Sequence, residues 1–152
     1  MITLEFSRSP GLVGQVIRTA TWSEWDHVSF VAPGGTLLSA LPGRGVTLAP
    51  RTAGAVWQRF EIGSPSAIYR RALGQIGKPY DWSAVIGIGL HRDWREEDSF
   101  FCSELVAWAF EVTGWPLLRA DRLNRITPRD LAMSPLLIPA DRHPSAPPLE
   151  RP

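Results

Sequence analysis

The chain has 152 residues, of which 44% are hydrophobic and 20% charged, and its formal net charge at pH 7 is +1. These values fit one ordinary globular domain with a full hydrophobic core. The 16 basic residues are scattered and form no periodic stripe, which argues against nucleic acid as the main partner.

Neither a membrane span nor a secretory signal is visible. The most apolar run, Ala84–Leu90, is too short to cross a bilayer and contains two glycines. Residues Met1–Phe6 lack a basic segment followed by an apolar one, so no signal peptide is predicted. We therefore expect a protein without a transmembrane segment that is cytoplasmic as synthesised, with export by another route left open. Its oligomeric state stays undetermined.

The first half of the chain has mainly the two-residue period of β-strands. A helix is expected from Ser9-Pro10 to about Ala20, since Pro10 suits a first helical turn. The turn residues Pro33-Gly34-Gly35 predict a hairpin. The expected strands are Ile2–Phe6, His27–Val31, Thr36–Leu41, Val46–Leu48 and Val56–Ile62.

The second half changes to the period of helices. The expected elements are a helix from Ser64-Pro65 to Gly77, a short helix over Tyr80–Leu90, a charged loop over His91–Asp98, a helix over Phe101–Thr113 and a capped turn over Thr127–Leu131. Strands followed by helices predict an α+β fold in which the sheet packs against the helices. The domain is expected to span residues 1–135. The proline-rich residues 136–152 are expected to form an extended or disordered tail.

Cys102 is the only cysteine of the chain and lies where the predicted helix begins. Unpaired N–H groups and the helix dipole favour a thiolate at such a position, which predicts a pKa below that of an ordinary thiol. A lone cysteine on an apolar helix face is also a common core residue. The sequence alone leaves both interpretations open.

His27 is the candidate base for Cys102, because an imidazole can take the thiol proton and then stabilise the thiolate. We expect the sheet to carry His27 on the face that packs against the Cys102 helix. In a hairpin of even register, Ser39 projects from the same face as His27 and can orient its ring. Asp26 competes for that role, although adjacent strand residues point to opposite faces.

These segments resemble the NlpC/P60 papain-like hydrolases. Gly77-Lys78-Pro79-Tyr80 followed by Phe101-Cys102-Ser103-Glu104-Leu105-Val106 is similar to the cysteine half of that family, and Asp26–Val31 with Gly34–Ala40 is similar to its histidine hairpin. Here histidine precedes cysteine. That order resembles the circularly permuted branch of YiiX-like and lecithin:retinol acyltransferase-like proteins.

The resemblance implies a permuted papain-like fold and a thiol hydrolase with Cys102 as nucleophile, His27 as base and Ser39 as third residue. Family members generally carry His, Asn, Gln or Glu at the third position, so Ser39 is a departure. The implied substrate is an amide or ester, with peptidoglycan stem peptides slightly ahead of lipid acyl groups. Tyr80 matches a pocket tyrosine of the family. Trp22 and Trp25 flank a polar segment and are the other candidates for the substrate groove.

No cofactor or metal is predicted. His91 and His143 have no ligand partner at useful spacing, and no phosphate-binding glycine loop is present. Two further functions stay open: a lipid acyl hydrolase or acyltransferase, and a non-catalytic binding module on the same fold. A structural protein in which Cys102 only packs is the third alternative.

Overall fold

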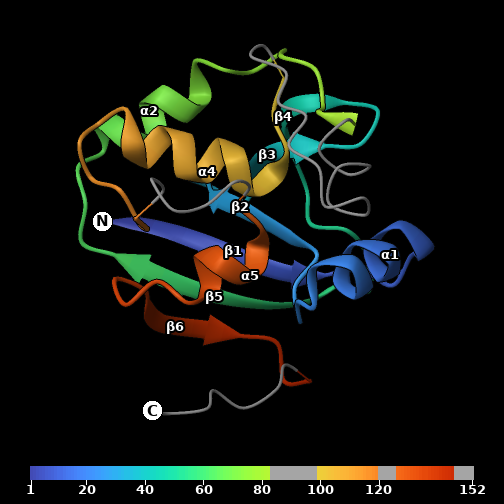
Figure 1. Ribbon diagram of the computed structural model, residues 1–152. Coiled ribbons are helices and arrows are strands. Elements are labelled where there is room, and N and C mark those ends of the chain that lie inside the picture. The colour runs from blue at the N-terminus through green and yellow to red at the C-terminus, as the bar shows by residue number, and fades with distance from the viewer. Residues whose placement is uncertain (83–98, 120–125, 146–152) are drawn as a thin grey trace.

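The computed structural model describes residues 1–82, 99–119 and 126–145. Within them, six strands form one sheet in the order β4-β3-β2-β1-β5-β6, and each pair of neighbours is antiparallel (Figure 1). The strands are β1 (Ile2–Arg8), β2 (His27–Val31), β3 (Leu37–Leu41), β4 (Gly45–Ala49), β5 (Val56–Ile62) and β6 (Ile138–Arg142). The helices are α1 (Leu12–Thr21), α2 (Ala67–Leu73), α4 (Cys102–Glu111) and α5 (Pro128–Ala132). The predicted α+β class is confirmed.

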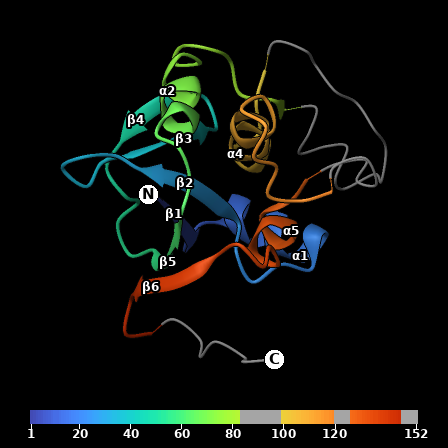
Figure 2. The same ribbon diagram turned by 90° about the vertical axis from the view of Figure 1, so that its left-hand side faces the viewer.

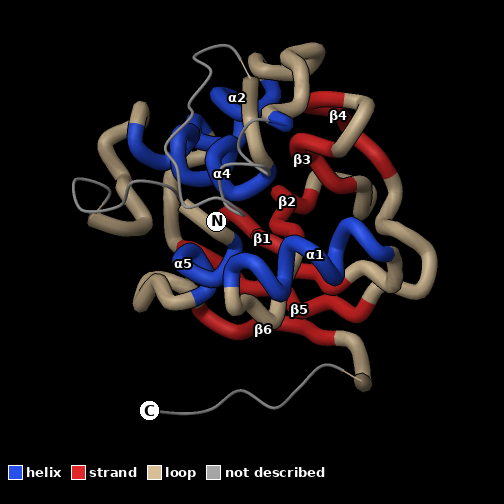
Figure 3. The backbone as a smooth tube through the Cα atoms, turned by 45° about the vertical axis from the view of Figure 1, so that its right-hand side comes forward, coloured by secondary structure: helices blue, strands red, loops and turns tan. Residues whose placement is uncertain are grey.

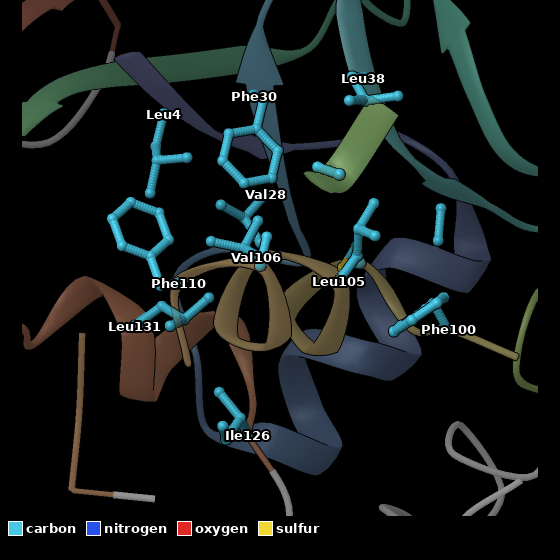
Figure 4. Packing of buried hydrophobic residues seen from close by; sticks show 14 of the residues in the cluster. Leu4, Val28, Phe30, Leu38, Phe100, Leu105, Val106, Phe110, Ile126 and Leu131 are labelled. Carbon is cyan, nitrogen blue, oxygen red and sulfur yellow. The ribbon is translucent and has the colours of Figure 1, made fainter. Parts of the chain in front are cut away.

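One face of the sheet carries the hydrophobic core and packs against α4. Val28 and Phe30 of β2 are fully buried and point toward Val106 and Phe110 of α4 (Figure 4). The rings of Phe30 and Phe110 stack with their centroids 6.2 Å apart. The predicted packing of the sheet against the helix that begins at Cys102 is confirmed, because neither apolar surface can be buried alone.

The opposite face is crossed by the connection between β4 and β5. These strands are separated by β3, β2 and β1, so residues 50–55 have to pass over the sheet. Figure 2 shows this connection on the side of the sheet away from α4. Arg51 in the connection binds Glu5 of the central strand β1, which ties the crossing segment to this face.

The C-terminal segment differs from the expected tail. Residues Ile138–Arg142 form β6, which pairs with β5 at the edge of the sheet (Figure 3). All five side chains of β6 are exposed, so backbone pairing rather than burial holds the strand, and hydrophobic periodicity gives no signal for it. The ordered chain therefore extends past residue 135, and the tail prediction is wrong for residues 138–142.

Most other elements lie close to their predicted positions. α1 begins at Leu12 rather than at Ser9-Pro10, and α2 is shorter than the helix expected up to Gly77. The expected helix over 80–90 and the loop over 91–98 fall largely outside the described residues. Among the described helices, none is long and apolar enough to cross a bilayer.

Candidate functional site

Cys102 is the first residue of α4, as the sequence predicts. The Phe101 N–H donates to the Glu104 carboxylate at 3.1 Å, which fixes the start of the helix. The thiol is buried, with 1% of the residue exposed, and its Sγ lies 4.0 Å from the Asp26 carbonyl oxygen. The backbone N–H groups of Val28 and Ser103 favour the thiolate.

The environment of the thiol disfavours the thiolate. Burial raises the pKa of Cys102 to about 12, and the N–H groups of Val28 and Ser103 offset only part of that rise. Asp26 and Glu104 raise the pKa further by charge repulsion. The predicted pKa below an ordinary thiol value is therefore wrong, because loss of hydration outweighs the N–H groups at the helix start.

His27 and Ser39 meet as an even register requires. The Oγ of Ser39 lies 2.6 Å from Nε2 of His27, so the Nδ1 atom is the nitrogen left for a reaction partner. Burial lowers the pKa of His27 to about 4, and the charge of Glu5 opposes this shift. The imidazole is consequently neutral at pH 7 and can serve as a base. That Ser39 orients the ring in a reaction stays a prediction.

Strand alternation places His27 on the face away from α4, so the expectation that it faces the helix is wrong. Val28 and Phe30 point toward α4, and neighbouring residues of a strand point to opposite faces (Figure 4). Among the described residues, the polar contacts of the Cys102 thiol go to backbone groups and none goes to the His27 ring.

The thiol and the imidazole nevertheless both lie near the start of β2. β2 and β3 pair at Phe30↔Leu38 and Val31↔Leu37, and the pairing stops before Val28. The backbone of Val28 favours the thiolate of Cys102 and so lies near the sulfur. The bond from His27 to Ser39 spans the same two strands from the other face. The two groups thus lie on opposite faces of the sheet near the start of β2.

Asp26 is engaged elsewhere. Its carboxylate accepts hydrogen bonds from the Ser9 N–H at 2.9 Å and from the Ser9 hydroxyl at 3.1 Å, and it forms an ion pair with Arg18 of α1. Burial raises the pKa of Asp26, and these partners oppose that shift. The contacts tie the loop before β2 to α1, and they turn Asp26 away from the role of orienting His27.

The three predicted groove residues lie in different environments. Tyr80 forms a parallel bridge with Phe100, just before α4, and its ring centroid is 5.9 Å from that of Phe101. Burial raises the pKa of Tyr80, and the nearby Cys102 adds to the rise. Tyr80 therefore adjoins the thiol, although its role in binding is a prediction.

The two tryptophans of the predicted groove, Trp22 and Trp25, differ in their exposure to solvent. Trp22 is 84% exposed at the end of α1, whereas Trp25 is 5% exposed and belongs to the hydrophobic core. Trp25 therefore packs in the core, which corrects its predicted place in a groove. Trp22 remains available at the surface.

Sequence reasoning missed a buried polar cluster beside His27. Glu5 of β1 accepts hydrogen bonds from Arg51 at 2.6 and 2.5 Å and from Arg59 at 2.9 Å. Both arginines also lie over the ring of Trp57. Glu5 alternates with Leu4 and Phe6, which signals a polar face. The pattern could not show that this face is covered by residues 50–55.

A metal site has no support in the described residues. In residues 1–82, 99–119 and 126–145, no three His, Cys, Asp or Glu side chains group closely enough to hold a metal ion. Cys102 is a free cysteine whose thiol contacts backbone groups.

Comparison with known proteins shows a likeness of fold. No family model matches the chain, and no curated protein matches it in sequence. Among the solved structures that match is the metalloprotein YiiX from Escherichia coli O157:H7, with a TM-score of 0.69 and 15% sequence identity. The match covers 93% of this chain and 96% of the YiiX chain. At this identity the likeness shows a shared fold.

Proposed function

We propose that this protein is a papain-like thiol hydrolase that cleaves an amide or ester bond. The observation that carries the proposal is the position of Cys102 at the first residue of α4, beside the strand whose first residue, His27, bonds to Ser39. A buried cysteine with only a packing role would require no histidine–serine pair at the adjoining strand. The YiiX-like fold and the family motifs support the same conclusion.

In the proposed reaction, Nδ1 of His27 takes the proton of the Cys102 thiol as Sγ attacks the carbonyl carbon of the substrate. The tetrahedral oxyanion accepts a hydrogen bond from the Cys102 backbone N–H at the start of α4. The imidazolium then gives its proton to the leaving amine or alcohol, and a thioester forms. Water attacks the thioester with His27 as base, which releases the acid and restores the thiol.

The resting pair is neutral in this mechanism. With the pKa of Cys102 at about 12 and that of His27 at about 4, the proton stays on sulfur until a substrate is bound. The transfer has to accompany attack on the carbonyl, because a free thiolate–imidazolium pair is costly in this buried position. Slow alkylation of the free protein is therefore compatible with catalysis.

Peptidoglycan stem peptides are the favoured substrates, ahead of lipid acyl groups. The Tyr80 and Cys102 segments resemble the peptidase half of the family, whereas the permuted order resembles its lipid-acting branch. The test is to incubate the purified protein separately with muropeptides and with phospholipid or acyl-ester substrates, with Cys102→Ala as the blank. Cys102-dependent cleavage of muropeptides supports the proposal, and cleavage of lipids alone overturns the peptide preference.

A non-catalytic binding module on the same fold is the second candidate. The observation in its favour is the burial of Cys102 together with the raised pKa of its thiol. The same incubation decides between the two, since a binding module gives no Cys102-dependent turnover with either substrate class.

A further inference from the structure

Helix α1 lies at one side of the molecule and exposes an apolar face (Figure 1). Leu12 is 81% exposed, and Val13 and Val16 are exposed as well. At about 100° per residue, the three side chains fall within about 100° of the helix circumference. The opposite side of α1 is buried against the domain. The folded protein therefore holds these apolar side chains outward.

Trp22 ends α1 in a strained backbone conformation. Its φ is 51°, and in the part of the chain that the structure describes it is the only residue other than glycine with a positive φ. Its N–H donates to the Arg18 carbonyl, which closes the last turn of the helix. Glycine is the usual residue at such a position, because a bulky side chain is strained there. The Trp22 side chain is largely exposed and gains little packing in return. The fold alone therefore gives no reason for a tryptophan at this position.

We propose that Leu12, Val13, Val16 and Trp22 form a membrane-binding surface that inserts into the interfacial layer of a lipid bilayer. Leucine and valine side chains gain free energy when they leave water. The amphipathic ring of tryptophan suits the boundary between headgroups and acyl chains. α1 is already folded, so no segment has to be ordered on binding. Trp22 then contacts lipid rather than lining the predicted substrate groove.

The charge and the size of this surface favour a bilayer over a protein partner. Arg18 is the only charged residue of α1, and it forms an ion pair with the buried Asp26. The surface therefore offers no charge pattern for a partner to match, and its binding should depend little on salt. A stable protein interface involves about 20–30 residues on each side, whereas the exposed apolar residues here number four. Binding to a bilayer depends on the inserted apolar area and requires no matching groove.

The test is cosedimentation of the purified full-length protein with vesicles of phosphatidylcholine alone and of phosphatidylcholine mixed with phosphatidylglycerol. We expect the unaltered protein to bind both. Trp22→Gly and Leu12→Ser should each lower the partition coefficient by about tenfold or more, since each removes one large inserted side chain. The matched control is Trp115→Gly. Trp115 is half-exposed and follows α4, which ends on the side of the molecule away from α1, so binding should not change (Figure 1).

Urea unfolding of the same variants separates binding from folding. Trp22→Gly relieves the strained φ, so its midpoint should not fall below that of the unaltered protein. A lower midpoint would assign the ring to packing and overturn the proposal. So would absence of binding to either vesicle, binding confined to the anionic vesicles, or an equal loss in Trp115→Gly.

A second copy of the chain is the competing occupant of this surface. A dimer in analytical ultracentrifugation that Trp22→Gly dissociates would overturn the proposal in favour of that occupant. Leu12→Ser leaves Trp22 in place and tests the helix face independently. Vesicle binding is measured without turnover, so a protein that cleaves neither muropeptides nor lipids contradicts the proposed function and leaves the binding result valid.

Discussion

The two faces of the sheet bury different kinds of side chain in this protein. On the face toward α4, residues such as Leu4, Val28 and Phe30 are fully buried among other apolar side chains. On the opposite face the same strands bury Glu5 and Ser29 beneath the connection from β4 to β5. Apolar packing tolerates many arrangements of similar volume, whereas each buried polar group requires a specific partner.

The candidate site joins the two faces. Cys102 comes from the helix on the apolar face. Its thiol is buried there, and burial raises its pKa. His27 points to the polar face, where Ser39 holds its Nε2 atom. The proposed reaction requires these two groups to meet beside the part of β2 that lies beyond the Phe30↔Leu38 pair.

The largest expected effect on stability belongs to the apolar face. Phe110→Ala should lower the free energy of unfolding by about 3–5 kcal/mol, since it leaves a cavity against Phe30. Urea unfolding monitored by circular dichroism measures the change. Val112→Ala, at an exposed position just after α4, is the control and should change stability by less than about 1 kcal/mol. Similar losses in both variants would contradict the assignment of Phe110 to the core.

The polar face should make the fold sensitive to acid. The pKa of His27 is about 4 in the folded protein and 6.5 in an unfolded chain, so the unfolded state binds more protons between these values. Stability therefore falls as the pH drops from about 6.5 to 4, by about 2–3 kcal/mol for this group. Unfolding measured at several pH values should show a weaker dependence in His27→Gln. An equally steep dependence in that variant would refute the burial of His27.

Arg51→Ala tests the connection that covers the polar face. The substitution removes two hydrogen bonds to Glu5 and the contact with the Trp57 ring. Arg59 remains as partner, so we expect a loss of about 2 kcal/mol, below the about 3–5 kcal/mol for leaving a buried charge unpaired. Faster proteolysis within residues 50–55 should accompany it. Arg70→Ala on α2 is the control, and equal losses would show that Arg51 does not anchor the connection.

Ser39→Ala should have the smallest effect. A serine hydroxyl orients an imidazole with one neutral hydrogen bond, which contributes about 1 kcal/mol, so kcat should fall by about fivefold. Loss of Cys102 or His27 should reduce kcat far more. Steady-state kinetics with a substrate that the unaltered protein cleaves in the incubation with muropeptides or lipids measures the three variants. Equal and complete loss in all three would give Ser39 a larger role than a single hydrogen bond explains.

The sequence predicted the strands, the start of α4 and the His27–Ser39 contact, because each of them depends on residues close together in the chain. Alternation located β1 to β5, the position of Cys102 identified the start of α4, and the spacing of His27 and Ser39 predicted their contact. Burial of the thiol was not predictable, because it depends on how closely α4 approaches β2. Glu5 and Arg51 are 46 residues apart, and no periodic pattern connects two charges at that separation. β6 was missed because its exposed side chains leave no hydrophobic period.

The passage of residues 50–55 across the sheet also imposes an order on folding. His27 and Ser39 belong to one hairpin and are 12 residues apart, so their contact closes a short loop. Glu5 and Arg59 are 54 residues apart and meet only when β5 docks beside β1. Because long-range pairing is slow, the histidine–serine contact should form in an early intermediate that still lacks its charged neighbours. The His27–Ser39 contact would therefore form before Glu5 gains its partner Arg59.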